Sequence, residues 1–144
     1  MNENGIIPLQ RRHLVFGWRM LFLFLLLGFA LETLHGLKVD WYLESNTETR
    51  RFLFTLAHAH GSLLAILNLA FAFTLQVRGG FQPRAARMVS PMLMAANILL
   101  PLGFFLGGIV VYQGDPGAGI TLAPIGAILL IIAVAMIAFS KDES

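Results

Sequence analysis

The chain has 144 residues, of which 57% are hydrophobic and 12% are charged, and its formal net charge is +2. A typical soluble domain carries about 25% charged residues, so this composition argues against a soluble enzyme. The chain has no cysteine, which excludes disulfides, thiolate metal ligands and cysteine nucleophiles. The excess positive charge lies beside the long apolar segments, which indicates membrane topology and gives no reason to expect a nucleic-acid partner.

Four apolar runs follow one another along the chain, at residues 14–36, 52–77, 89–112 and 118–140. Each reaches the roughly 20 residues needed to cross a hydrocarbon core as a helix. The backbone in lipid must satisfy its own hydrogen bonds, so helices are expected. The sequence therefore predicts an all-α, integral membrane four-helix bundle, with residues 1–144 as a single transmembrane domain. We expect the first run to be retained, because it is longer than the apolar core of a signal peptide.

Basic residues predict the orientation of these helices. With an even number of spans, both termini lie on the same side, and seven basic residues fall there against three on the other side. The seven are Arg11, Arg12, Arg19, Arg78, Arg84, Arg87 and Lys141, and the three are Lys38, Arg50 and Arg51. This imbalance favours cytoplasmic termini in a bacterial cytoplasmic membrane. The lipid bilayer is the expected partner, and association with other membrane subunits or with a second copy is left open.

One acidic residue and three histidines stand near the outer ends of the first two runs. Glu32 and His35 close the first run, and His58 and His60 lie in the second. Ionisable groups in a span are costly, so they are candidates for function. With Lys38 and Phe52 taken as the outer boundary, Glu32 and His58 each lie six residues below it, which is about 9 Å at 1.5 Å per residue. Packed as antiparallel neighbours, the two helices would bring these side chains into one layer.

The helical period predicts which way these side chains point. Glu32 and His35 are three residues apart and share a face. His58 and His60 are two residues apart, about 200° around a helix, so they face different ways. His58 shares its stripe with small and polar residues such as Gly61, which are typical of helix interfaces in membranes. We therefore expect His58 to point toward the first helix and His60 toward another helix, a second subunit or a cofactor.

Three functions are compatible with this cluster. Imidazole suits zinc, copper or iron, and a nearby carboxylate can ligate or orient it. The leading hypothesis is therefore a haem or transition-metal site in an electron-transfer component. A proton or quinone site is another interpretation of the same residues. The alternative is a non-catalytic structural or accessory subunit, in which Glu32 accepts a hydrogen bond from His58 or His35 and ties two helices. The third is a small oligomeric transporter or channel. An enzymatic role is not favoured, and the cofactor is not specified.

Two short segments carry a resemblance. Residues 34–38 (LHGLK) and 56–61 (LAHAHG) resemble small uncharacterised four-span bacterial membrane proteins. The pair His58 and His60 is also similar to the His-x-His of the haem–copper oxidase catalytic subunit, in which opposite-facing histidines of one helix serve two haems. That similarity implies that His58 and His60 are axial ligands of different centres. The oxidase subunit has many more spans, further haem histidines and a copper-binding set, which this chain lacks.

The other polar and small residues inside the runs suggest helix packing. Gly103 and Gly107 form a G-x-x-x-G pattern in the third run, which we expect to serve packing within the chain rather than between protomers. Asn68 and Asn97 both fall in the inner halves of their runs. We expect an interhelical hydrogen bond between them, with a polar path to the cytoplasm as the alternative.

Overall fold

A computed structural model describes residues 6–43, 48–78 and 82–140. Its helices are α1 (Ile6–Gly36), α2 (Asp40–Leu43), α3 (Glu48–Val77), α4 (Pro83–Ile109), the 3-10 helix η3 (Ala118–Thr121) and α5 (Leu122–Ala138). With η3 and α5 taken together, this part of the chain holds four helices long and apolar enough to cross a membrane. The predicted apolar helices are thereby confirmed, and the chain is a multi-pass membrane protein.

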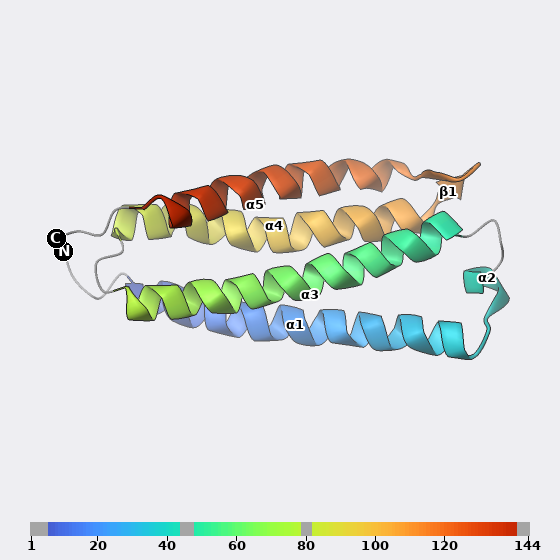
Figure 1. Cartoon of the computed structure of the whole chain (residues 1–144), viewed down its shortest axis with the longest axis horizontal. Coiled ribbons are helices and arrows are strands. Elements are labelled where there is room, and N and C mark those ends of the chain that lie inside the picture. The colour runs from blue at the N-terminus through green and yellow to red at the C-terminus, as the bar shows by residue number, and fades with distance from the viewer. Residues whose placement is uncertain (1–5, 44–47, 79–81, 141–144) are drawn as a thin grey trace.

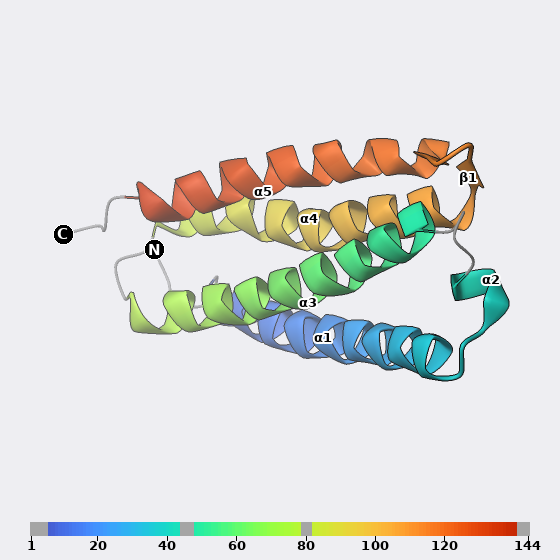
Figure 2. The same cartoon turned by 45° about the vertical axis from the view of Figure 1, so that its right-hand side comes forward.

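The four long helices lie side by side along the long axis of the molecule (Figures 1 and 2). Their order across the molecule is α1, α3, α4 and α5, because α3 packs extensively against both α1 and α4, and α5 packs against α4. Over the described residues, α1 touches α4 only locally and α5 forms no comparable interface with α1 or α3. The beginning of α1 and the end of α5 lie at the same end of the molecule (Figure 1).

This order leaves the two outer helices with most of their apolar surface uncovered. In the most apolar segments of α1 and α5, only 17% of the residues are buried within the molecule, against 39% for α3 and 44% for α4. Side chains such as Phe22, Phe29 and Ile131 are more than half exposed on these helices. Exposing this much apolar surface to water would be unfavourable, so this arrangement requires lipid as the solvent.

Three helices extend beyond their apolar runs. The structure begins α1 at Ile6, α3 at Glu48 and α4 at Pro83, four to eight residues ahead of the runs. Helical hydrogen bonding does not depend on hydrophobicity, so polar residues continue these helices past the apolar segment. Proline is well accommodated in the first turn of α4, where its missing N–H would have no helical partner.

The helix of the third apolar run, α4, ends three residues before that run does. It ends at Ile109, because Val111–Tyr112 (β1) pairs with Asp115–Pro116 (β2) as a small antiparallel hairpin. Gln113 and Gly114, at the tip, both have positive φ, of 51° and 90°. Positive φ at both central residues is the geometry of a tight hairpin turn, which β-branched or bulky residues resist.

Glycines set the close approach of neighbouring helices. A Cβ on Gly103 would meet the backbone nitrogen of Ala123, and one on Gly107 would lie 3.1 Å from the Cβ of Ile120. The G-x-x-x-G residues therefore pack against η3 and the start of α5 within the same chain. On α3, a Cβ on Gly61 would overlap the ring of Phe24 on α1.

Two arginines hold the ends of helices at opposite ends of the molecule. Arg78, after α3, donates to the backbone carbonyls of Ile137 at 3.3 Å and Ser140 at 3.0 Å. Arg50 donates from Nε to the carbonyl of Gly108 at 3.2 Å, and its guanidinium lies 4.7 Å from the centre of the Trp41 ring. Both satisfy carbonyls at helix C-termini, so these residues stabilise the fold in addition to any role in topology.

Candidate functional site

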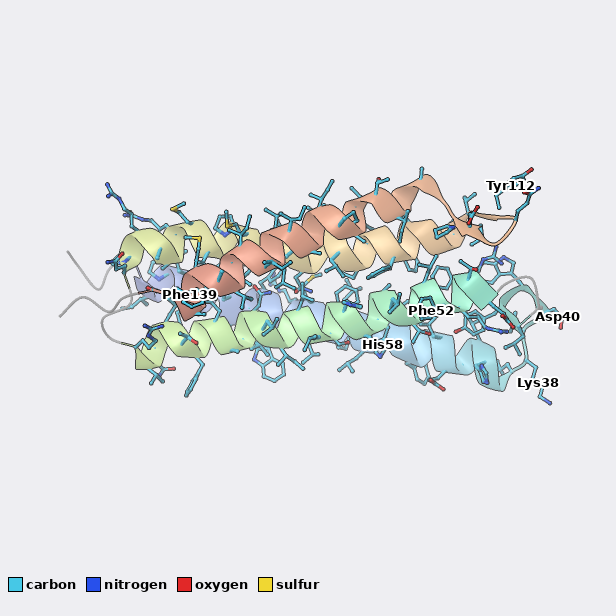
Figure 3. The ribbon with its side chains drawn as sticks, turned by 45° about the horizontal axis from the view of Figure 1, so that its top comes forward. Lys38, Asp40, Phe52, His58, Tyr112 and Phe139 are labelled. Atoms are coloured by element: carbon cyan, nitrogen blue, oxygen red, sulfur yellow. The ribbon has the colours of Figure 1, made fainter. Side chains whose placement is uncertain are left out.

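Three of the four predicted site residues line one pocket between α1 and α3. This outer pocket has a volume of about 420 Å³ and is lined by Glu32, His35 and His58, together with polar groups of Tyr42 and Arg51. Antiparallel packing of α1 and α3 brings these residues to the same end, as their depths in the two runs predicted. Figure 3 shows His58 closer to the end of the molecule that carries Lys38, Asp40 and Tyr112 than to the end with Phe139.

The imidazole of His58 is held by the backbone of α1. Its Nδ1 lies 2.8 Å from the carbonyl oxygen of Phe24. A carbonyl can only accept, so Nδ1 carries the proton and Nε2 of the neutral ring has a free lone pair. The ring lies against Gly28, where a Cβ would overlap it. Gly28 therefore makes the space that lets His58 reach α1.

His60 lies on another side of α3 and does not line the outer pocket. Its Nδ1 lies 2.9 Å from the carbonyl oxygen of Leu56, one turn earlier, and its ring centre is 5.0 Å from that of Phe104 on α4. The two histidines thus face different helices. In both, Nδ1 donates to a backbone carbonyl, and the described residues offer no hydrogen-bond partner to Nε2. This arrangement at Nδ1 is typical of histidines that ligate a metal through Nε2.

Glu32 and His35 do not tie the helices together. Both side chains are exposed, and within the described segments no hydrogen bond or ion pair joins Glu32 to His35 or His58. The close approach at Gly28 directs Nδ1 of His58 to the backbone carbonyl of Phe24 rather than to Glu32. Nor do the described residues include three His, Asp or Glu side chains grouped closely enough to hold a metal ion.

Tyr42 and Arg51 complete the outer pocket from the loop side. Tyr42 is only 4% exposed, and burial raises the pKa of its phenol, with the Glu32 charge adding to this effect and Arg51 opposing it. The phenol is therefore neutral at physiological pH. Arg51 donates to the carbonyl of Leu43 at 3.0 Å and lies 4.0 Å from the Glu48 carboxylate, which fixes a positive charge at the pocket.

A second polar site lies toward the other end of the molecule, around His13, which sequence reasoning missed. His13 is completely buried, and its Nδ1 lies 2.8 Å from Oδ1 of Asn68, while its Nε2 lies 2.8 Å from Oγ of Ser90. The ring also meets the edge of Phe71, with centres 4.9 Å apart. One imidazole therefore joins α1 to both α3 and α4.

The hydrogen bonds continue from His13 through two buried amides. The amide nitrogen of Asn68 donates to the Leu64 carbonyl at 2.9 Å and faces Oδ1 of Asn97 at 3.5 Å. The amide nitrogen of Asn97 donates to the Gly61 carbonyl at 3.0 Å. Because Asn68 directs its nitrogen this way, its oxygen accepts from Nδ1 of His13.

The residues His13, Asn68, Ser90 and Asn97 form what we call the inner polar network. Each side-chain donor atom in it has a hydrogen-bond acceptor. Ser90 donates to Nε2 of the neutral His13 ring, His13 donates to Asn68, and the series ends on a backbone carbonyl. Amides do not readily pass protons along such a series, and all four side chains are fully buried. The expected interhelical bond through Asn68 and Asn97 is therefore present as part of a three-helix tie.

His13 escaped prediction because it precedes the apolar run and follows two arginines. A usable signal is present nonetheless. His13, Gly17, Phe24, Gly28 and Leu31 recur at helical spacing, and all five are buried along one stripe of α1. Such a stripe places His13 on the packed face even though its sequence neighbours are polar.

Comparisons with known proteins leave these two sites as the basis for any assignment. No protein-family model, curated protein or solved structure matches the chain. The outer pocket is lined by His58, whose Nε2 has no hydrogen-bond partner among the described residues, whereas the side chains of the inner polar network are buried and bonded to one another.

Proposed function

We propose that the chain is a membrane four-helix bundle, with both termini on the cytoplasmic side of a bacterial cytoplasmic membrane, that binds a ligand in its outer pocket. The described arginines at the end where α1 begins and α5 ends outnumber the basic residues at the other end. That imbalance supports the orientation. The order α1, α3, α4 and α5 makes the bundle an open one, with lipid covering the outer faces.

The geometry of His58 carries the ligand-binding proposal. Its Nδ1 donates to the Phe24 carbonyl, so Nε2 of the neutral ring keeps a lone pair, and the side chain lines a pocket with Glu32 and His35. A lone pair on imidazole binds a Lewis acid, and iron, copper or zinc is its usual partner in proteins. We therefore favour haem or a transition-metal ion, in an electron-transfer component. A ligand hydroxyl, as in a quinol, would meet the same lone pair as a hydrogen-bond donor.

His60 extends the proposal to a second face of α3. It repeats the Nδ1–carbonyl bond of His58 and directs its ring toward Phe104 on α4. Two such histidines on different faces of one helix would serve two separate centres rather than one. The proposal therefore predicts that substitutions at His58 and His60 affect different ligands or different spectral bands.

The visible spectrum and metal content of protein purified in mild detergent test the proposal. We expect a haem Soret band or bound metal, either as isolated or after titration with haem, Cu²⁺ or Zn²⁺, and a loss of that signal in His58→Ala. Thr33→Ala is the control, because Thr33 is exposed next to Glu32 on α1 but does not line the outer pocket. A folded protein that binds none of these added ligands would refute a haem or metal site at His58.

A second candidate function is a non-catalytic structural or accessory membrane subunit. The inner polar network favours it, since His13 and its partners fix three helices without any cofactor. Under this proposal, His13→Ala weakens the fold, while His58→Ala changes no spectrum or metal content. The transporter alternative has less support, because Asn68 and Asn97 are bonded within the protein. Flux in proteoliposomes that depended on either asparagine would favour transport instead.

A further inference from the structure

A basic groove lies between α1 and α4 at the end where α1 begins. It has a volume of about 630 Å³, and its charged lining consists of Arg11, Arg12 and Arg19. The apolar part of the lining includes Val15, Phe16 and Met94. The groove thus combines concentrated positive charge with an apolar wall, on the outer surface of two membrane-spanning helices.

The three arginines of the basic groove have no anionic partner in the described part of the chain. Arg11, Arg12 and Arg19 are all exposed, and no hydrogen bond or ion pair connects them to another described residue. Arg50 and Arg78 differ, because both donate to carbonyls at helix ends. The structure therefore uses some arginines for its own fold and leaves these three available.

The arginines of the basic groove are spaced along α1 as expected for side chains near the boundary between lipid headgroups and acyl chains. Arg12 and Arg19 are seven residues apart on one face of α1, a rise of about 10 Å. His13 is bonded to Ser90 of α4, which holds the two helices together beside the groove, and Met94 lies one turn further into the apolar segment. Long arginine side chains at such positions extend toward the headgroups while their stems lie along apolar surface.

We propose that the basic groove binds an anionic phospholipid of the leaflet that surrounds this end. Its phosphate would lie among Arg11, Arg12 and Arg19, because guanidinium groups pair with phosphate through several parallel hydrogen bonds. One acyl chain would follow Val15, Phe16 and Met94. The apolar wall favours a lipid over free phosphate, and the unopposed charge favours an anionic headgroup over a zwitterionic one. This inference depends on the helices spanning a membrane and not on a ligand at His58.

Lipid titration of the full chain in detergent tests the basic groove. Thermal unfolding is followed while phosphatidylglycerol, phosphatidylcholine or inorganic phosphate is added, and native mass spectrometry counts the lipids retained. The test variant is Arg12→Gln with Arg19→Gln. Its matched control is Arg84→Gln with Arg87→Gln, which removes the same charge from exposed positions of α4 that do not line the groove. Circular dichroism verifies that both variants are folded.

We expect phosphatidylglycerol to raise the unfolding temperature of the unsubstituted protein more than phosphatidylcholine or phosphate does. Each arginine near the surface contributes roughly fivefold to anionic-lipid affinity, so the test variant should bind phosphatidylglycerol roughly 25-fold more weakly. The control variant should retain most of the effect. Equal losses in both variants, or equal responses to all three additives, would overturn the proposal. Lipid selectivity without any haem or metal signal would leave this inference standing and refute only the haem or metal site at His58.

Discussion

His13 of α1 and Asn68 of α3 are joined by a 2.8 Å hydrogen bond that no solvent reaches. The bond lies toward the end where α1 begins, whereas the outer pocket lies toward the other end of the same two helices. The α1–α3 interface therefore has a closed polar tie at one end and an accessible histidine at the other. Substitutions at His13 should therefore change the stability of the protein, and substitutions at His58 should change ligand binding.

Replacing His13 by alanine should lower the free energy of unfolding by about 2–4 kcal/mol. Interhelical hydrogen bonds in membranes contribute about 0.6–1.7 kcal/mol each, and an unpaired buried polar group adds a further penalty. Titration of detergent-solubilised protein with a denaturing detergent, followed by circular dichroism, measures the change. His35→Ala is the control, because His35 is exposed and should change stability by less than about 0.5 kcal/mol. Similar losses in both variants would contradict a structural role for His13.

Asn68→Ala should destabilise the protein more than Asn97→Ala does. Asn68 accepts from His13 and donates to the Leu64 carbonyl and to Asn97. Asn97 makes two hydrogen bonds, because it donates to the Gly61 carbonyl and accepts from Asn68. Because the two amides belong to one network, the double variant should show a coupling energy of at least about 0.5 kcal/mol. A double-mutant cycle of unfolding free energies measures it, and strictly additive losses would argue against the network.

Gly28→Ala should displace the His58 ring and cost about 1–3 kcal/mol, the usual penalty for overpacking. The new methyl group would occupy the space of the imidazole, so the bond from Nδ1 to the Phe24 carbonyl should break. Nitrogen NMR of labelled histidine would detect the change in tautomer. Gly36→Ala is the control, because a Cβ there meets nothing within 4 Å. An unchanged His58 signal in Gly28→Ala would refute this packing.

Gly103→Ala should separate α4 from the start of α5. The obstructing atom is the backbone nitrogen of Ala123, which no rotamer change can move. Forced contacts of this kind cost about 1–3 kcal/mol in a packed interior. We expect a lower unfolding temperature and faster hydrogen exchange in α5, with α1 and α3 unaffected. Exchange that increased equally in all helices would indicate a different cause.

The stability of the outer end should fall in alkaline solution because of Tyr42. Burial raises the pKa of this phenol from the ordinary value of 10.0, so the folded state holds the proton more tightly than the unfolded state. The stabilisation is complete below pH 10 and is lost as the pH rises through the higher pKa of the folded state. The chain has two tyrosines, so Tyr112→Phe leaves Tyr42 as the only one that absorbs as tyrosinate. Titration of that variant at or below pH 10 would contradict the prediction.

The outer pocket was accessible to sequence reasoning because it depends on local quantities. Depth along each run and the helical period placed Glu32, His35 and His58 near one another, and the structure has all three lining one pocket. The hydrogen bonds were not accessible in the same way. His58 binds a backbone carbonyl of α1, and every residue has such a carbonyl, so residue types give no indication of it.

Composition and the lengths of the apolar runs, by themselves, determined a multi-pass helical membrane protein, because crossing a lipid core requires long apolar segments with internally bonded backbones. Tertiary structure alone decided the row order of the helices, the burial of His13 and the position of the basic groove. These features depend on which faces of distant segments meet. His13 and Ser90 are 77 residues apart, and only the packing of α1 on α4 brings them to 2.8 Å.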